Sequence, residues 1–338
     1  MTSPRSETPK RILLCRTDRL GDVVLALPCA LLLKKMFPDC RLSFLVQPYT
    51  APAVHMLPAV DDVIEMGFNE NSAAIAATLR THQFDAAVAL YPEYRVARAL
   101  KEAGIPVRAG IFYRWYSLLF THRHREHRKH NLKHEAEYNL SLTYATFAQE
   151  GRWEDWLAPG DIFPLPLEIP AKADQRIADI LGRFKGAHRR IVVLHPGGSG
   201  SAHRWPIERF CELVRRFKEI SDSGIIITGN AGESFLCQAV AQAAGGAGIS
   251  LCGQISLPEL AAMLRHCQLL ITNSTGPLHL GRAVGAKVLG LFPSVQAMSP
   301  KRWGPYGLPQ NALTASVGKS MESIAVASVL KRASELLE

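Results

Sequence analysis

The chain has 338 residues, 47% of them hydrophobic, and carries a formal net charge of +9. Its length fits two domains of about 150 residues. No apolar run approaches the ~20 residues of a membrane span. The first residues, MTSPRSETPKR, lack the apolar stretch of a secretory signal. These features favour a cytoplasmic protein with reduced cysteines, and the positive charge indicates an anionic partner: a nucleotide, a phospholipid surface or a nucleic acid.

A strand and a helix at the start of the chain frame the first candidate site. RILLC, residues 11–15, is the apolar run of a buried parallel strand, and VVLALPCALLLKKMF has apolar residues at helical spacing. The loop between them, RTDRLGD, lies at the carboxyl end of the strand, where α/β sheets place ligands. Asp22 falls in the first turn of the helix, so it either complements the helix dipole or serves as a reactive carboxylate. Asp18 is a second carboxylate in the same loop.

Strand-like and helix-like segments continue to alternate through residue 111, which predicts a doubly wound domain. The strand-like segments are 41–46, 62–66, 85–90 and 107–111, and the helix-like segments are 73–80 and 95–103. No GxGxxG follows the first strand, so the dinucleotide-binding fingerprint is absent.

Residues 122–134, HRHREHRKHNLKH, have the most unusual composition in the chain. Five His, three Arg and two Lys stand against one Glu. Such a run is either a solvated surface or a contact with an anionic acceptor or membrane surface. A metal site is disfavoured, because the run lacks the carboxylates or thiols at ligand spacing that known sites use. KHEAEYNLSLTYATFA, which follows, reads as a helix that ends the first half.

Four prolines and no periodicity mark residues 158–170, APGDIFPLPLEIP, as a linker. We therefore predict one domain over residues 1–165 and a second over residues 166–338. A helix is expected over 171–184, at the start of the second domain.

The second half repeats the theme of buried strand, small-residue loop and helix. In RRIVVLHPGGSGSAHRWP, residues 197–201 can hold phosphate with backbone N–H groups, and His203 and Arg204 add positive charge; the alternative is a flexible Gly/Ser loop. The strand at 224–228 leads into the turn GNAGE and a helix over 234–244, and another helix starts at Leu257. We expect the nucleotide base to lie towards Gly229–Glu233 and Leu257.

The stretch ITNSTGPLHLGRAVGAKVLGL, residues 271–291, is the strongest local signal. It predicts a strand, a turn at Ser274, Thr275 and Gly276, a helix over 279–284, and a second strand. Backbone N–H groups, two hydroxyls and the positive end of a helix dipole meet in such a turn and can bind an anion. The alternative is an ordinary capped turn. A last amphipathic helix is expected over 324–337.

This layout fits two doubly wound domains that face each other across a cleft. The second domain would bind a nucleotide diphosphate, and the first would supply a catalytic base and bind the acceptor. Five segments then carry a resemblance: RTDRLGDVVLALP, KHEAEYNLSL, LHPGGSGSAHRWP, STGPLHL and PKRWGPYG. In this order they resemble glycosyltransferase family 9, the heptosyltransferases of lipopolysaccharide core assembly. The resemblance implies a GT-B fold, an ADP-heptose donor, an acceptor of the lipid A–Kdo type, inversion at the anomeric carbon and no metal or other cofactor. It also admits peripheral contact with the inner membrane and a terminal helix that packs back on the first domain.

The resemblance implies that Asp22 is the catalytic base, that Ser274, Thr275 and Gly276 bind phosphate, and that His279 is the motif histidine. The candidate donor-site residues are Ser199, Gly200, His203, Arg204, Gly229, Leu257, Ser274, Thr275, Gly276 and His279. The candidate acceptor-site residues are Arg16, Asp18, Arg123, Arg125, Arg128 and Lys129. The chain departs from the family in two places: many members have Asp-Thr-Gly where this chain has Ser-Thr-Gly, and a Lys where His203 stands.

The residues also favour metal-free transfer, because none of the eleven Asp has another Asp two positions away and the DxD metal motif is therefore absent. The leading hypothesis is an inverting glycosyltransferase in which Asp22 accepts the proton of the acceptor hydroxyl. One alternative is a nucleotide-sugar epimerase or hydrolase of the same fold. Another is a basic nucleic-acid-binding protein, which we disfavour because the basic run lacks interleaved aromatic residues.

Overall fold

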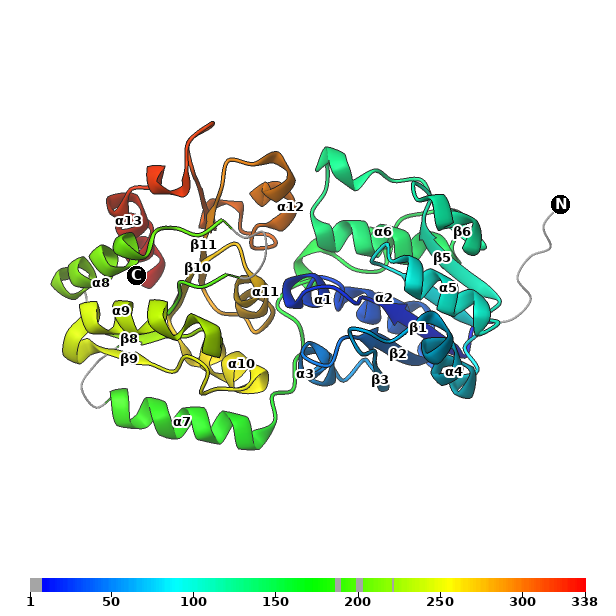
Figure 1. The fold of residues 1–338 in the computed structure, drawn as a ribbon, viewed down its shortest axis with the longest axis horizontal. Coiled ribbons are helices and arrows are strands. Elements are labelled where there is room, and N and C mark those ends of the chain that lie inside the picture. Colours follow the sequence, from blue (N-terminus) through cyan, green and yellow to red (C-terminus); the bar gives the residue numbers. More distant parts are fainter. Residues whose placement is uncertain (1–7, 186–189, 199–202, 221) are drawn as a thin grey trace. The chain divides into compact units, whose positions relative to one another are not determined.

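The chain forms two compact units that divide between Ile162 and Phe163, inside the proline-rich segment (Figure 1). The computed structural model describes residues 8–185, 190–198, 203–220 and 222–338. Each unit is built around a six-stranded parallel sheet, which confirms the predicted α/β class.

The first unit has the strand order β3-β2-β1-β4-β5-β6. Its strands are β1 Arg11–Cys15, β2 Arg41–Val46, β3 Asp62–Glu65, β4 Ala86–Ala89, β5 Val107–Ile111 and β6 His122–His124. Its helices are α1 Leu20–Val24, α2 Pro28–Met36, α3 Ala51–His55, α4 Ser72–His82, α5 Tyr94–Glu102 and α6 Glu135–Phe147, with short 3₁₀ turns η1 Trp115–Leu119 and η2 Arg128–His130.

The central strands of this sheet are apolar along their whole length because packed elements cover both faces, so their side chains are buried on each side. The predicted strands and helices of the first half are confirmed, with two differences. The first helix divides in two, because Pro28 has no backbone N–H to continue a helix but suits the start of a new one. The start of the His/Arg-rich run forms the edge strand β6, where polar side chains are tolerated.

The second unit has the strand order β12-β11-β10-β7-β8-β9. Its strands are β7 Arg190–His195, β8 Ser223–Ile227, β9 Gly248–Ser250, β10 Leu269–Asn273, β11 Val288–Phe292 and β12 Ala312–Thr314. Its helices are α7 Ala171–Lys185, α8 Ile207–Ile220, α9 Ser234–Ala244, α10 Leu257–His266, α11 Gly276–Ala283, α12 Pro300–Trp303 and α13 Val326–Leu337. Read in reverse, as β9-β8-β7-β10-β11-β12, this order is the same as that of the first unit. In each sheet the first strand, β1 or β7, lies near the centre, and the chain adds strands first on one side of it and then on the other.

The terminal helix α13 packs against other elements of the second unit. Val329 and Ala333 are fully buried in a core shared with α8 and β10. The helix has one apolar stripe, at the 3–4 residue spacing of an amphipathic helix, and this stripe packs in the core of the second unit. Among the residues that the structure describes, no helix is both long and apolar enough to cross a bilayer.

Candidate functional site

Arg16 is the centre of a buried charge cluster at the carboxyl edge of the first sheet. It directly follows β1, and the whole residue is only 2% exposed. Its guanidinium donates to Asp18 Oδ1 at 2.7 Å and to Asp22 Oδ1 at 2.6 Å. It also donates to Glu135 Oε1 at 3.0 Å, so one cation holds three carboxylates together.

Helix α6 supplies the far side of this cluster. Glu135, the first residue of α6, is fully buried and also accepts a hydrogen bond from Arg128 of η2. Asn139, one turn later, accepts from Arg16 at 3.0 Å and donates to Leu25 O at 3.1 Å. The α6 start is therefore tied to the β1–α1 loop through side chains about 120 residues apart in sequence.

The surroundings of Asp22 raise its pKa to about 7. Burial is the largest cause, and the negative charges of Asp18 and Glu135 add to it, while Arg16 opposes it. The position of Asp22 in the first turn of α1 agrees with the sequence. Burial raises this pKa, although a place in the first turn of a helix favours the ionised carboxylate; α1 has only five residues. A carboxylate with this pKa is suited to general-base catalysis near neutral pH.

The structure separates the candidate acceptor residues into three places. Arg16, Asp18 and Arg128 belong to the buried cluster with Asp22, where Arg16 is an internal cation that positions carboxylates. Lys129 is exposed on η2. The remaining two, Arg123 and Arg125, lie on and just after β6.

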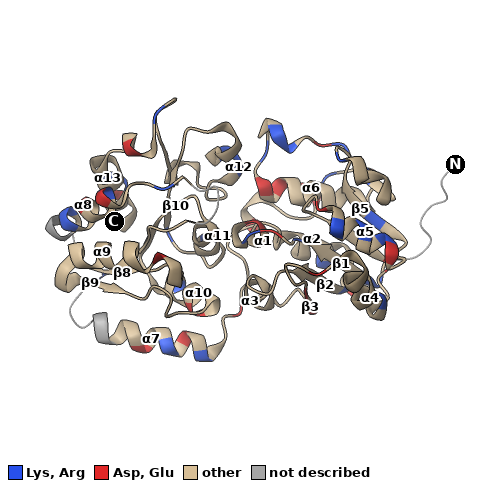
Figure 2. Cartoon of the chain, viewed as in Figure 1, with Lys and Arg blue, Asp and Glu red and all other residues tan. Residues whose placement is uncertain are grey.

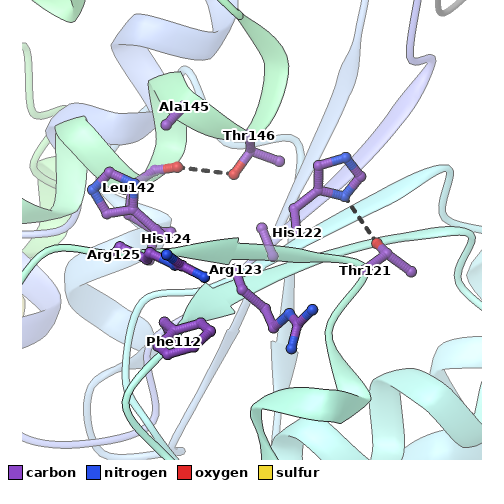
Figure 3. A pocket seen from close by; sticks show the side chains of 10 residues that line it. Phe112, Thr121, His122, Arg123, His124, Arg125, Leu142, Ala145 and Thr146 are labelled. Carbon is purple, nitrogen blue, oxygen red and sulfur yellow. Dashed lines mark hydrogen bonds between the residues drawn. The ribbon is translucent and has the colours of Figure 1, made fainter. Parts of the chain in front are cut away.

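A cavity of about 360 Å³ lies where β5 and β6 meet α6 (Figure 3). The guanidinium groups of Arg123 and Arg125 lie 5.7 and 4.5 Å from the centre of the Phe112 ring. His122 hydrogen-bonds Thr121 at 2.9 Å. The lining is thus basic and polar on the β6 side and apolar beneath, which suits an anionic ligand with a hydrophobic or sugar-ring face.

In the second unit, Asn273 joins the two loops that the sequence assigned to the donor. It ends β10 and is fully buried. Its side-chain oxygen accepts from the Trp205 N–H at 2.9 Å, and its side-chain nitrogen donates to Pro196 O at 2.8 Å. The loop after β7 and the turn after β10 are therefore held side by side, as parallel neighbours β7 and β10 require.

The turn after β10 leads directly into α11. This helix starts at Gly276, earlier than the sequence suggested, because Pro277 suits its first turn. Thr275 is its N-cap residue, and the Thr275 hydroxyl lies 3.1 Å from that of Thr272. Ser274 is half-buried beside it, and His279 is buried within the helix. The first backbone N–H groups of an eight-residue helix are oriented for an anion at this place.

Four of the six remaining candidate donor residues lie in described parts of the second unit. Ser199 and Gly200 fall outside the described residues. His203 and Arg204 are exposed just before Trp205. Gly229 follows β8 and Leu257 begins α10; both are partly buried.

Two residues of this region, His195 and Glu233, are not among the site residues predicted from the sequence, although Glu233 ends the segment expected to face the nucleotide base. The Glu233 carboxylate accepts the Gly198 N–H at 2.7 Å and the Asn230 N–H at 2.9 Å, and so fixes the glycine loop to the turn after β8. A Cβ on Gly197 would lie 2.2 Å from this carboxylate, so a larger residue there would displace the Glu233 side chain. The signal for Glu233 was a capping box, in which a carboxylate follows Asn230 by three positions.

His195 ends β7, and its Nδ1 lies 3.1 Å from the Thr228 hydroxyl. Burial lowers the pKa of His195 to about 4, so its ring is neutral near pH 7. No sequence signal distinguished it from the rest of an apolar strand. Across the described parts of both units, no group of three or more His, Cys, Asp or Glu is arranged to hold a metal ion.

Comparisons with known proteins identify relatives over nearly the whole chain. Residues 72–330 match the family model of glycosyltransferase family 9 (heptosyltransferase). A putative glycosyltransferase of Haemophilus influenzae is 27% identical over 300 residues, covering 88% of this chain and 86% of the relative. A glycosyl transferase family 9 structure from Veillonella parvula has a TM-score of 0.81 at 21% identity, covering 97% of each chain. The structure of Escherichia coli ADP-heptose lps heptosyltransferase II has a TM-score of 0.78 at 19% identity, covering 97% of this chain and 98% of the other.

Proposed function

Because the chain belongs to glycosyltransferase family 9 and has the GT-B fold, we propose that it transfers heptose from ADP-heptose to an anionic glycolipid of the lipopolysaccharide core. The family makes it a heptosyltransferase-like glycosyltransferase. The name of the Escherichia coli structure, which includes ADP-heptose and lps, supports this choice of donor and acceptor. One observation carries the proposed chemistry: a buried Asp22 whose pKa is raised to about 7.

In the proposed reaction, Asp22 takes the proton from an acceptor hydroxyl while that oxygen attacks the anomeric carbon of heptose. The bond from this carbon to the diphosphate oxygen breaks, and ADP leaves with the electron pair. Arg16 keeps the Asp22 carboxylate in place through its 2.6 Å contact, so the base needs no reorientation during the step. A single displacement of this kind inverts the anomeric carbon.

The donor diphosphate is assigned to the start of α11, at Ser274, Thr275 and Gly276, with Ser199, Gly200, His203 and Arg204 from the loop after β7. The support is Asn273, whose two hydrogen bonds fix these two segments to each other. The positive end of α11 and two basic side chains would stabilise the charge of the departing ADP, which is the work a metal does in other transferases.

The acceptor is assigned to the first unit. Arg123 and Arg125 beside Phe112 offer cations and an aromatic face to an anionic sugar. The basic run is divided: Arg128 belongs to the buried cluster, and Arg123 and Arg125 line the cavity. This argues against nucleic-acid binding, because nucleic-acid-binding proteins present a continuous basic surface.

The test is to incubate the protein with ADP-heptose, with and without a lipid A–Kdo acceptor, and to measure ADP and glycosylated product. Transfer predicts ADP release that requires the acceptor and equals the product formed, with inverted anomeric configuration by NMR. ADP release without acceptor would instead indicate a hydrolase. Conversion of the nucleotide sugar without ADP release would indicate an epimerase. A thermal-shift panel of nucleotide sugars identifies the donor independently of the acceptor.

A further inference from the structure

An exposed apolar patch lies on the connection from β5 to β6 in the first unit. Its members are Tyr113, Trp115 and Leu118, which we call the docking patch; their exposed fractions are 42%, 76% and 78%. Large apolar side chains exposed together on one short segment are unusual on a protein that meets only water.

Local geometry puts the three side chains on one side of the segment. In the 3₁₀ turn η1, residues three apart are aligned, so Trp115 and Leu118 share a face. Arg114 has extended backbone angles, which point its two neighbours, Tyr113 and Trp115, in the same direction.

The patch is held rigidly. Tyr116 and Phe120, on the opposite face of the segment, are 6% and 5% exposed in the core beneath α5. The Trp115 ring lies 4.9 Å from Tyr94, at the start of α5, and Tyr113 stacks on His127 at 3.3 Å between ring centres. The exposed rings therefore belong to a packed surface, and their exposure is not a result of a loose end.

Charge around the patch selects its partner. No residue from Ala103 through Arg125 is acidic. Arg114 lies between two patch residues, and Arg123 and Arg125 follow η1; all three are exposed. Lys and Arg residues of the first unit occur on α5, on β5 and in the loops beside α6 (Figure 2). Exposed aromatic and aliphatic side chains surrounded by arginines are suited to the interface of an anionic bilayer. There, aromatic rings lie at the level of the headgroups and cationic side chains contact lipid phosphates.

We propose that the docking patch inserts into the surface of an anionic lipid bilayer, with Trp115 and Leu118 at the boundary between headgroups and acyl chains. The patch leads along the chain into β6 and the Arg123–Arg125 cavity, so a bilayer in this position would present a lipid-linked acceptor near those cations. This surface adds to the proposed function, and it is tested on vesicles that contain no acceptor, so that either proposal can fail alone.

The test measures co-sedimentation of the full chain with vesicles of phosphatidylcholine alone and of phosphatidylcholine mixed with phosphatidylglycerol. The wild-type protein should bind the mixed vesicles and bind the neutral ones much less. The double variant Trp115→Ser/Leu118→Ser should lower the partition coefficient about 10- to 100-fold, since two large apolar side chains no longer enter the lipid. Arg114→Glu should lower it roughly five- to thirtyfold, because a cation near the surface is replaced by an anion.

The matched control is Phe235→Ser/Val317→Ser, which removes two apolar side chains that are 82% and 94% exposed in the second unit. It should bind vesicles as the wild type does. Donor affinity and melting temperature should be unchanged in all these variants, which separates loss of docking from loss of folding or of the donor site.

A second measurement uses vesicles with brominated acyl chains, which quench tryptophan fluorescence on contact. Quenching should occur in the wild type and largely disappear in Trp115→Phe. The proposal is overturned if the wild type ignores anionic vesicles, if the docking-patch double variant binds as well as the wild type, or if neutral vesicles bind equally well. Quenching that persists in Trp115→Phe would overturn it as well.

Discussion

At the scale of single residues, the proposed chemistry rests on the buried cluster around Arg16. Three carboxylates, Asp18, Asp22 and Glu135, share two guanidinium groups, those of Arg16 and Arg128. One negative charge is left in excess where water is scarce. Asp22, whose side chain is 17% exposed, can exchange its proton with solvent or substrate. Near neutral pH the Asp22 carboxyl therefore exchanges between its protonated and ionised forms, whereas an isolated surface aspartate is ionised.

Replacing this base should affect the chemical step and spare the donor. Asp22→Asn keeps the side-chain shape but cannot accept a proton at neutral pH. We expect kcat to fall about 10²–10⁴-fold while the Kd for ADP stays near the wild-type value. Steady-state kinetics and calorimetric titration with ADP measure the two quantities. If Asp18→Asn reduces kcat and Asp22→Asn does not, the base is Asp18; if neither does, the proposed mechanism fails.

Glu135 should tune this base from a distance. Glu135→Gln removes a negative charge that raises the pKa of Asp22, so that pKa should fall. Asp22 acts when deprotonated, so activity is lost as pH drops through its pKa. The acidic limb of the kcat/KM profile, expected near pH 7 in the wild type, should therefore move to lower pH in the variant.

The matched control for this prediction is Glu137→Gln. It removes the same charge from the same turn of α6, where Glu137 accepts the His134 N–H at 2.9 Å. Its pH limb should stay where the wild-type limb is. An unmoved limb in Glu135→Gln, with activity merely scaled down, would give Glu135 a purely structural role.

At the scale of elements, the continuous apolar strands and the small-residue turns after them were readable from the sequence, because each pattern has one stable placement in a parallel sheet. Edge strand β6 and turn η1 could not be predicted from the sequence, because their polar and exposed apolar residues show neither helical nor strand periodicity. Glu135 was not recognised as part of the cluster with Asp22, because its contact with Arg16 spans 119 positions. The raised pKa of Asp22 depends on burial, which no local pattern records.

The start of α11 gives a prediction at this scale. Thr275→Asp places a carboxylate at the N-cap, where the proposed diphosphate would meet a like charge. ADP affinity should fall by about 100-fold or more, although an aspartate is itself an acceptable N-cap and the helix should persist. Calorimetric titration with ADP measures the loss, and circular dichroism checks the fold.

Thr314→Asp is the matched control for this change, because Thr314 is exposed at the end of β12 in the same unit. It should bind ADP as the wild type does. Unchanged ADP affinity in Thr275→Asp would remove the α11 turn from the donor site.

At the scale of the whole molecule, the proposed transfer relies on helix N-termini and basic side chains for the leaving diphosphate. Activity should therefore persist in excess EDTA, and adding Mg²⁺ back should change the rate by less than about twofold. The assay for ADP release with acceptor measures this. A strict requirement for Mg²⁺ or Mn²⁺ would contradict the assignment of charge stabilisation to the protein.

The two units share one strand order, and the chain passes between them at a single point, Ile162 to Phe163, since α13 ends within the unit that contains its neighbours. Genetic recombination at that point would therefore exchange one complete fold for another without cutting a sheet or a core. A lineage could keep the second unit, the proposed nucleotide-sugar half, and acquire a new first unit, the proposed acceptor half, in one event. New pairs of units would then diversify glycans faster than single residue changes alone. The same junction, between Ile162 and Phe163, is where a laboratory chimera should be made.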